Sequence, residues 1–206
     1  MAEASALMPG RPDEVAALLT NLLLCGVCLG SAAQTFQINR GAAAGFLLQA
    51  VVPLLDTAAL LPAPLGLSLE SARCCPDDAW VCTVVGLPLL AFGFHWLNGD
   101  CSTANVLLGG ALLLAGGSDY YSEEGRAMVA HSVRSVASIT ILIVSVFTGN
   151  AYGIVGSLLL GMAELLVETQ LQQLLVLRKG DALCGLMAAA NLALRWALQM
   201  QQRELD

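Results

Sequence analysis

The stretch "SVASITILIVSVFTGNAYGIVGSLLLGMA", residues 135–163, contains no charged side chain. It forms the centre of an apolar run from Ala127 to Leu177 that is too long for one membrane-spanning helix, since a span needs only about 20 residues. The segment "TGNAYG" (148–153) interrupts this run, and its Gly-Asn pair is typical of a turn. The sequence therefore predicts two spanning helices joined by a short turn, which places the chain among integral membrane proteins.

The composition of the whole chain agrees with this class. Hydrophobic residues make up 57% of the sequence and charged residues 12%, whereas soluble domains average about 45–50% apolar and about 25% charged residues. The net charge is −7, and the basic residues are scattered along the chain. Nucleic-acid binding is excluded because no basic face is present.

Cutting the chain at charges, prolines and turn residues predicts an all-α polytopic transmembrane helix bundle of about seven spans. The last span carries Arg195, so a bundle of six spans is the alternative. A cytosolic N-terminal tail is expected at 1–14 and a C-terminal tail at 199–206. The predicted spans are 15–33, 41–61, 79–97, 102–117, 127–148, 151–177 and 182–198.

Basic residues set the predicted orientation. With seven spans, most Lys and Arg residues fall on the side that the N-terminal tail shares with loops 62–78, 118–126 and 178–181. This distribution predicts a cytosolic N-terminus. Several spans lie near the short end of the usual range, which favours a thin endomembrane such as the endoplasmic reticulum, although the sequence does not fix the organelle.

Three acidic residues are candidates for an intramembrane ion or proton site. Asp56 follows Pro53 in the second span, and Glu164 and Glu168 share one face of the sixth. At about 1.5 Å per residue, Asp56 and Glu164 fall in the inner third of the bilayer. An ionisable residue at such a depth in the membrane usually has a functional role. The alternative is that each helix is already leaving the membrane there, which the glutamines after Glu168 favour.

A second polar group, His95, Asp100 and Arg195, is expected nearer the outer face. A salt bridge between Arg195 and Glu164 is disfavoured because their predicted depths differ by about 10 Å. One histidine with one carboxylate offers too few ligands for zinc, and we predict neither a metal nor a cofactor.

Small residues and cysteines suggest contacts with partners or with the lipid bilayer. Gly26 with Gly30, and Gly41 with Gly45, have the G-x-x-x-G spacing that lets membrane helices approach closely. These faces could pack within the bundle, against a second copy, or against another membrane protein. The segment "ARCCPD" precedes the third span, and its Cys74 and Cys75 are candidates for palmitoylation.

The sequence holds no G-x-S-x-G, no H-E-x-x-H and no phosphate-binding Gly-Lys loop. We therefore predict a non-enzymatic structural or partner-binding membrane component. The alternative function is a small proton- or cation-coupled transporter or channel that uses Asp56 and Glu164.

Three segments carry a resemblance to a known family. They are "RGAAAGFLLQ" (40–49), "GLPLLAFGFHWLNGD" (86–100) and "TILIVSVFTGNAYG" (140–153). Together they resemble the transmembrane protein 276 family of vertebrate multi-pass membrane proteins. The resemblance implies a multi-pass membrane protein and carries no activity and no site residues.

Overall fold

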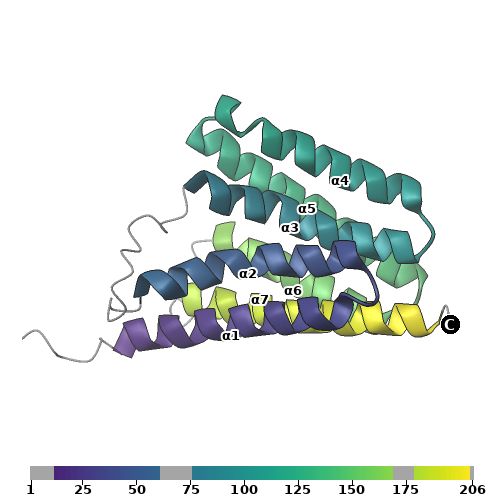
Figure 1. Cartoon of the computed structure of the whole chain (residues 1–206), viewed down its shortest axis with the longest axis horizontal. Coiled ribbons are helices and arrows are strands. Elements are labelled where there is room, and N and C mark those ends of the chain that lie inside the picture. The colour runs from purple at the N-terminus through teal and green to yellow at the C-terminus, as the bar shows by residue number, and fades with distance from the viewer. Residues whose placement is uncertain (1–11, 61–75, 169–178, 205–206) are drawn as a thin grey trace, which may run out of the picture.

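The computed structural model describes residues 12–60, 76–168 and 179–204, in which it contains seven α-helices and one short 3₁₀-helix. This part of the chain has no strand, so the predicted all-α bundle is confirmed. The helices run roughly alongside one another (Figure 1). They are α1 (Pro12–Thr35), α2 (Arg40–Leu60), α3 (Pro76–Leu97), α4 (Cys101–Gly116), η2 (Ser118–Tyr120), α5 (Glu123–Phe147), α6 (Ala151–Glu168) and α7 (Lys179–Arg203).

The seven helices lie at the positions of the seven predicted spans. Four of them, α1, α2, α3 and α5, are long and apolar enough by themselves to cross a membrane, and α4 and α6 are shorter apolar helices. The predicted sixth span extends to 177, but α6 ends at Glu168 and residues 169–178 lie outside the described part.

At the other end of the chain, α7 continues to Arg203, beyond the predicted span end at 198. Polar contacts fix this last turn to its neighbours. The amide of Gln201 donates a hydrogen bond to the Phe94 carbonyl, and that of Gln199 donates one to Gln34. Residues assigned from sequence to the C-terminal tail therefore extend the helix along α1 and α3.

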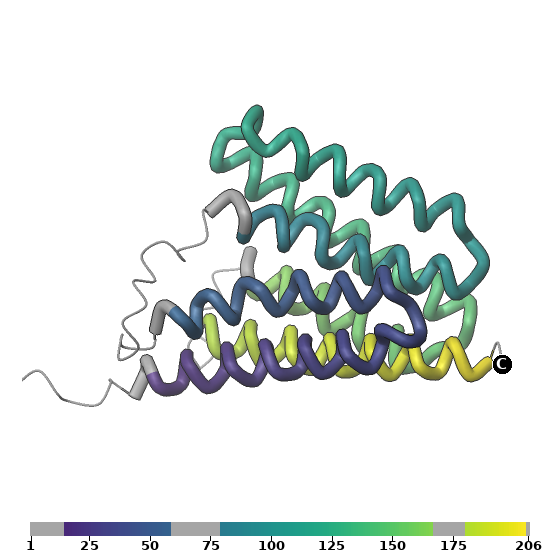
Figure 2. The backbone as a smooth tube through the Cα atoms, viewed as in Figure 1, coloured from purple at the N-terminus to yellow at the C-terminus, as the bar shows by residue number. Residues whose placement is uncertain are grey.

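Six helices form a closed ring. In order around it, α1 packs on α2, α2 on α3, α3 on α5, α5 on α6, α6 on α7, and α7 returns to α1. Helix α4 lies outside this ring, where it packs mainly against α3 and forms one edge of the bundle (Figures 1 and 2). Helix α1 lies at the opposite edge in the same view.

The ring is filled with apolar side chains towards one end. This core comes from the last turns of α1 and α3, the first turns of α2, the middle of α5 and α6, and the second half of α7. Its largest fully buried members are Phe46, Leu90, Phe94, Ile141, Leu160, Leu194 and Leu198. The interior is therefore closed at the end that carries the α1–α2, α3–α4 and α5–α6 turns.

Glycine permits the close contact between α2 and α3. A Cβ on Gly45 would lie 2.7 Å from the carbonyl oxygen of Gly86, and one on Gly93 would lie 2.7 Å from the Cβ of Ala42. Backbones can approach this closely only where side chains are absent or minimal. The Gly41–Gly45 face is thus used inside the bundle.

Candidate functional site

The candidate site lies near the other end of the bundle, where α1, α3, α5 and α7 begin and α2 and α6 end. Here an ion cluster between α5 and α6 lies beside a cavity within the ring, and Arg134 belongs to both features.

The ion cluster consists of Glu164 on α6 with His131 and Arg134 on α5. Glu164 Oε1 lies 3.2 Å from Arg134 Nε, and Glu164 Oε2 lies 3.1 Å from His131 Nδ1. The Glu164 side chain is only 10% exposed, against 24% for Arg134 and 45% for His131. Since a carboxylate without a partner is very costly at such a place, these contacts explain how the helix accommodates Glu164.

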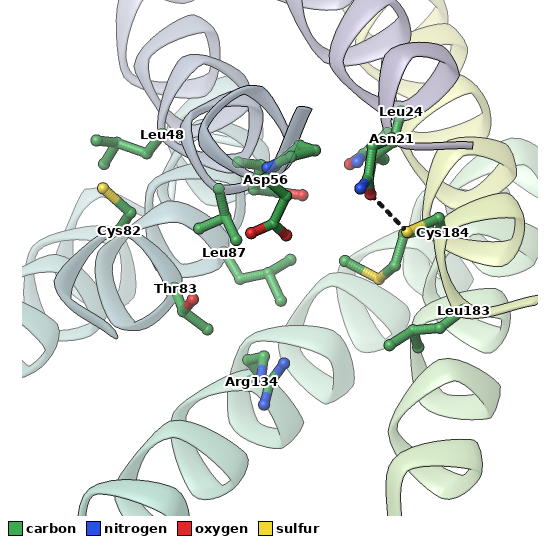
Figure 3. A pocket seen from close by; sticks show the side chains of 15 residues that line it. Asn21, Leu24, Leu48, Asp56, Cys82, Thr83, Leu87, Arg134, Leu183 and Cys184 are labelled. Atoms are coloured by element: carbon green, nitrogen blue, oxygen red, sulfur yellow. Dashed lines mark hydrogen bonds between the residues drawn. The ribbon is translucent and has the colours of Figure 1, made fainter. Parts of the chain in front are cut away.

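The cavity has a volume of about 240 Å³ and is lined by five helices of the ring, α1, α2, α3, α5 and α7. Its wall is mostly apolar. Asp56 and Arg134 point towards the same space from α2 and α5 (Figure 3). The described residues contain no ion pair between these two side chains, and Arg134 is instead paired with Glu164.

Two amide side chains deeper in the ring also border the cavity. Asn191 is fully buried and donates a hydrogen bond from Nδ2 to Cys28 Sγ at 3.3 Å. Its Oδ1, and both Nε2 and Oε1 of Gln49, are buried atoms with no hydrogen-bond partner among the described residues. A buried polar atom left in this state typically costs about 1–3 kcal/mol. These three atoms are buried behind the cavity wall and do not face its open space.

The second polar group lies at the closed end of the bundle. His95 is buried, and its Nδ1 lies 3.4 Å from Asp100 Oδ2. Asp100 caps α4 by accepting the backbone N–H of Thr103 at 3.1 Å. Hydrogen bonds from the hydroxyl and the backbone of Thr103 lower the pKa of the Asp100 carboxyl, and His95 adds to this effect. The pair thus contributes a helix cap and a turn contact.

Arg195 does not join this pair in the described structure. Its guanidinium lies over the ring of Trp196 at 5.5 Å, and its buried Nε has no hydrogen-bond partner there. Nor does it pair with Glu164 among the described contacts, as the difference in depth predicted.

The remaining sequence candidates are placed as follows. Asp56 lines the cavity, whereas Glu164 is not among its described lining residues and touches the cavity only through Arg134. Glu168 is the last residue of α6, and its side chain lies outside what the structure describes. Cys74 and Cys75 also lie outside the described residues. Among the residues the structure describes, no group of three His, Cys, Asp or Glu side chains could hold a metal ion.

Sequence reasoning missed the partners of Glu164, although the sequence contains a signal for them. Gly149 lies at the α5–α6 turn with a φ of +66°. Arg134 precedes this glycine and Glu164 follows it at the same separation along the chain. In an antiparallel helix pair, residues equally distant from the turn lie at the same depth. Pairing the two helices about Gly149 would have placed Arg134 opposite Glu164.

The comparisons with known proteins point to one family. No family model and no solved structure matches the chain. Transmembrane protein 276 of Bos taurus is 46% identical over 192 residues, which cover 93% of this chain and 90% of the relative. Transmembrane protein 276 of Mus musculus and of Homo sapiens are each 44% identical over 200 residues, covering 97% of this chain and 100% of each relative.

The chain belongs to the transmembrane protein 276 family. The resemblance noted in the sequence is thereby confirmed. Together with its apolar helices, membership in the transmembrane protein 276 family identifies the chain as a transmembrane protein. The name of the transmembrane protein 276 relatives gives no activity, so a role must be argued from the geometry.

The ion cluster leads to a first prediction about stability. Replacing Glu164 with Gln should lower the melting temperature of the purified chain in detergent, because Arg134 then loses its counter-charge in a poorly hydrated place. The expected loss is about 3 kcal/mol, at the lower end of the range for breaking a buried pair. Glu204→Gln, at an exposed position on the last turn, should leave the melting temperature unchanged.

A double-mutant cycle provides the stricter form of this test. In the background of Arg134→Gln, the further change Glu164→Gln should cost much less than it does in the wild type, since the shared interaction is already lost. A melting temperature that rises in Glu164→Gln, or two losses that add fully, would contradict the assigned pairing.

Proposed function

We propose that this chain is a non-enzymatic component of a membrane assembly, and that it associates with a second copy of itself through the outward face of α1. The observation that carries this proposal is the contrast between the two G-x-x-x-G pairs. A Cβ on Gly26 or on Gly30 would meet no atom within 4 Å, whereas Gly41 and Gly45 are occupied by α3.

The outward face of α1 extends along several turns. Its leucines Leu19, Leu22 and Leu29 are 61%, 47% and 44% exposed. These positions follow the spacing of one helical face together with Gly26 and Gly30. Helix α1 packs within the chain mainly on α2 and α7. The face thus combines a small-residue groove with flanking leucines, as membrane helix pairs require.

The α2–α3 contact supports the proposed mode of association. There, glycines at the same spacing let a neighbouring helix approach to backbone contact within this very chain. A second copy of α1 could be seated in the same way. The non-enzymatic part of the proposal rests on the sequence, which lacks the catalytic motifs considered above.

The test is self-association in a bilayer. Two populations of the full chain, labelled with donor and acceptor dyes, are mixed in liposomes, and energy transfer is followed as the protein is diluted with lipid. The paired change Gly26→Leu with Gly30→Leu should abolish specific transfer while leaving the melting temperature unchanged, since both positions face open space. Gly161→Leu, also at an open position but on α6, is the matched control and should retain transfer.

Undiminished transfer in the Gly26/Gly30 variant would contradict self-association through α1. Capture of a different membrane protein that depends on Gly26 and Gly30, without energy transfer between copies, would keep the assembly role and replace the partner.

A second candidate function is a small proton- or cation-coupled transporter or channel. It is favoured by the position of Asp56 on the cavity wall, near the end of α2. The pairing of Glu164 with Arg134 and His131 leaves Asp56 as the carboxylate that would handle the ion. Cation flux into liposomes should then be lost in the variant Asp56→Asn. Flux that persists unchanged in this variant would contradict the transport role.

A further inference from the structure

The cavity inside the ring has the features of a binding site, and this inference goes beyond the assembly role proposed above. It is lined from α1, α2, α3, α5 and α7, so any occupant would contact most of the bundle. Helix α1 contributes Asn21 and Leu24 here, whereas the glycine face of the same helix points away from the ring. The two sites are therefore physically separate.

The cavity reaches well into the bundle but does not pass through it. Gln49 lies about three helical turns before the end of α2 at Leu60, and Asn191 about three turns after the start of α7 at Lys179. At about 1.5 Å per residue both amides are roughly 16–18 Å from that end, near the middle of a ~30 Å hydrocarbon core. Beyond them the apolar core fills the ring. The site is a pocket with one closed end.

The unpaired amide atoms of Gln49 and Asn191 do not serve as ligands here, because they are buried behind the cavity wall. Asp56 lies about two helical turns closer to the end of α2 than Gln49 does. A polar head at Asp56 would therefore place an attached chain along the deeper part of the wall.

The charge around the cavity selects a cation. Arg134 is neutralised by Glu164, with which it forms an ion pair at 3.2 Å. Asp56 has no ion-pair partner among the described residues and faces the same space as Arg134 (Figure 3). The pocket therefore carries one uncompensated negative charge, which attracts an ammonium group and repels an anion.

Most of the remaining wall is apolar. The side chains of Leu24, Leu48, Val52, Leu87, Leu183 and Met187 line it. A small polar solute would leave these groups without contacts, whereas an alkyl chain would cover them. We propose that the cavity binds an amphiphilic amine, with its ammonium group held by Asp56 and its alkyl chain along the leucines.

The test compares four probes with the full chain in lipid nanodiscs. Octylamine, 1-octanol and octanoate share an eight-carbon chain and differ in the polar group, and ethylamine keeps the amine without the long chain. Octylamine should bind about tenfold or more tightly than each of the others by calorimetric titration, a difference equal to about 1.4 kcal/mol. If 1-octanol bound as tightly as octylamine, the ammonium charge would not be required. If ethylamine bound as tightly as octylamine, the alkyl chain would not be required. Either result would overturn the proposal.

Variants assign the binding to this cavity. Asp56→Asn should weaken octylamine about tenfold and leave 1-octanol unaffected, because only the charge is removed. The matched control Asp119→Asn lies on an exposed turn away from the ring and should bind as the wild type does.

A thiol readout does not depend on the folding of any variant. Cys184 lines the cavity and donates a hydrogen bond to Asn21 Oδ1 at 3.3 Å, whereas Cys101 is exposed at the first turn of α4. Octylamine should slow alkylation of Cys184 by N-ethylmaleimide at least threefold and leave Cys101 unchanged, as read by peptide mass spectrometry. The proposal would be overturned if octylamine did not protect Cys184 from alkylation, or if no probe bound to the chain. It would also be overturned if Asp119→Asn weakened octylamine binding as much as Asp56→Asn does.

Discussion

In a hydrocarbon environment a charged side chain must find a partner inside the protein, and the arrangement of Glu164 follows from that constraint. Its carboxylate contacts both His131 and Arg134 of α5, so that a single acidic residue links α6 to α5 through two polar contacts. The same pairing determines the electrostatics of the cavity, because it neutralises Arg134 and leaves Asp56 as the charge that an occupant would meet. The ion cluster and the cavity are thus connected through Arg134, and a change at Glu164 acts on both.

Small residues set the remaining geometry. Where glycine faces a neighbour within the chain, as Gly45 faces Gly86, the helices approach to backbone contact and the ring closes around an apolar core. Where glycine faces outwards, as Gly26 and Gly30 do on α1, an added Cβ would meet only open space. In the proposed dimer, the same small-residue chemistry would also join helices from two copies of the chain.

The hydrophobic pattern predicts the helices well, because the length of an apolar run is fixed by the thickness of the bilayer. The position of a turn can also be predicted from the sequence, and "TGN" at 148–150 separates α5 from α6 as expected. The cavity is not predictable in the same way. Its lining residues come from five separate helices, and only the packing of these helices shows that Asp56 and Arg134 face one space. The partners of Glu164 are predictable in part. Arg134 and Glu164 are equally distant along the chain from Gly149, so pairing α5 and α6 about this turn places the two residues opposite each other.

We expect the bundle to cross the membrane with the ion cluster and cavity at its cytosolic end and the His95–Asp100 pair at the other. Thiol labelling from one side tests this orientation, because Cys101 begins α4 at the closed end and Gly180 lies in the first turn of α7 at the cavity end. Two variants are compared in sealed microsomes whose cytosolic face points outwards. One keeps Cys101 as its single cysteine, and the other has all cysteines replaced and carries Gly180→Cys. A membrane-impermeant maleimide should label position 180 at once and Cys101 only after detergent is added. Labelling of both positions from the same side, or of Cys101 alone in sealed vesicles, would contradict this orientation.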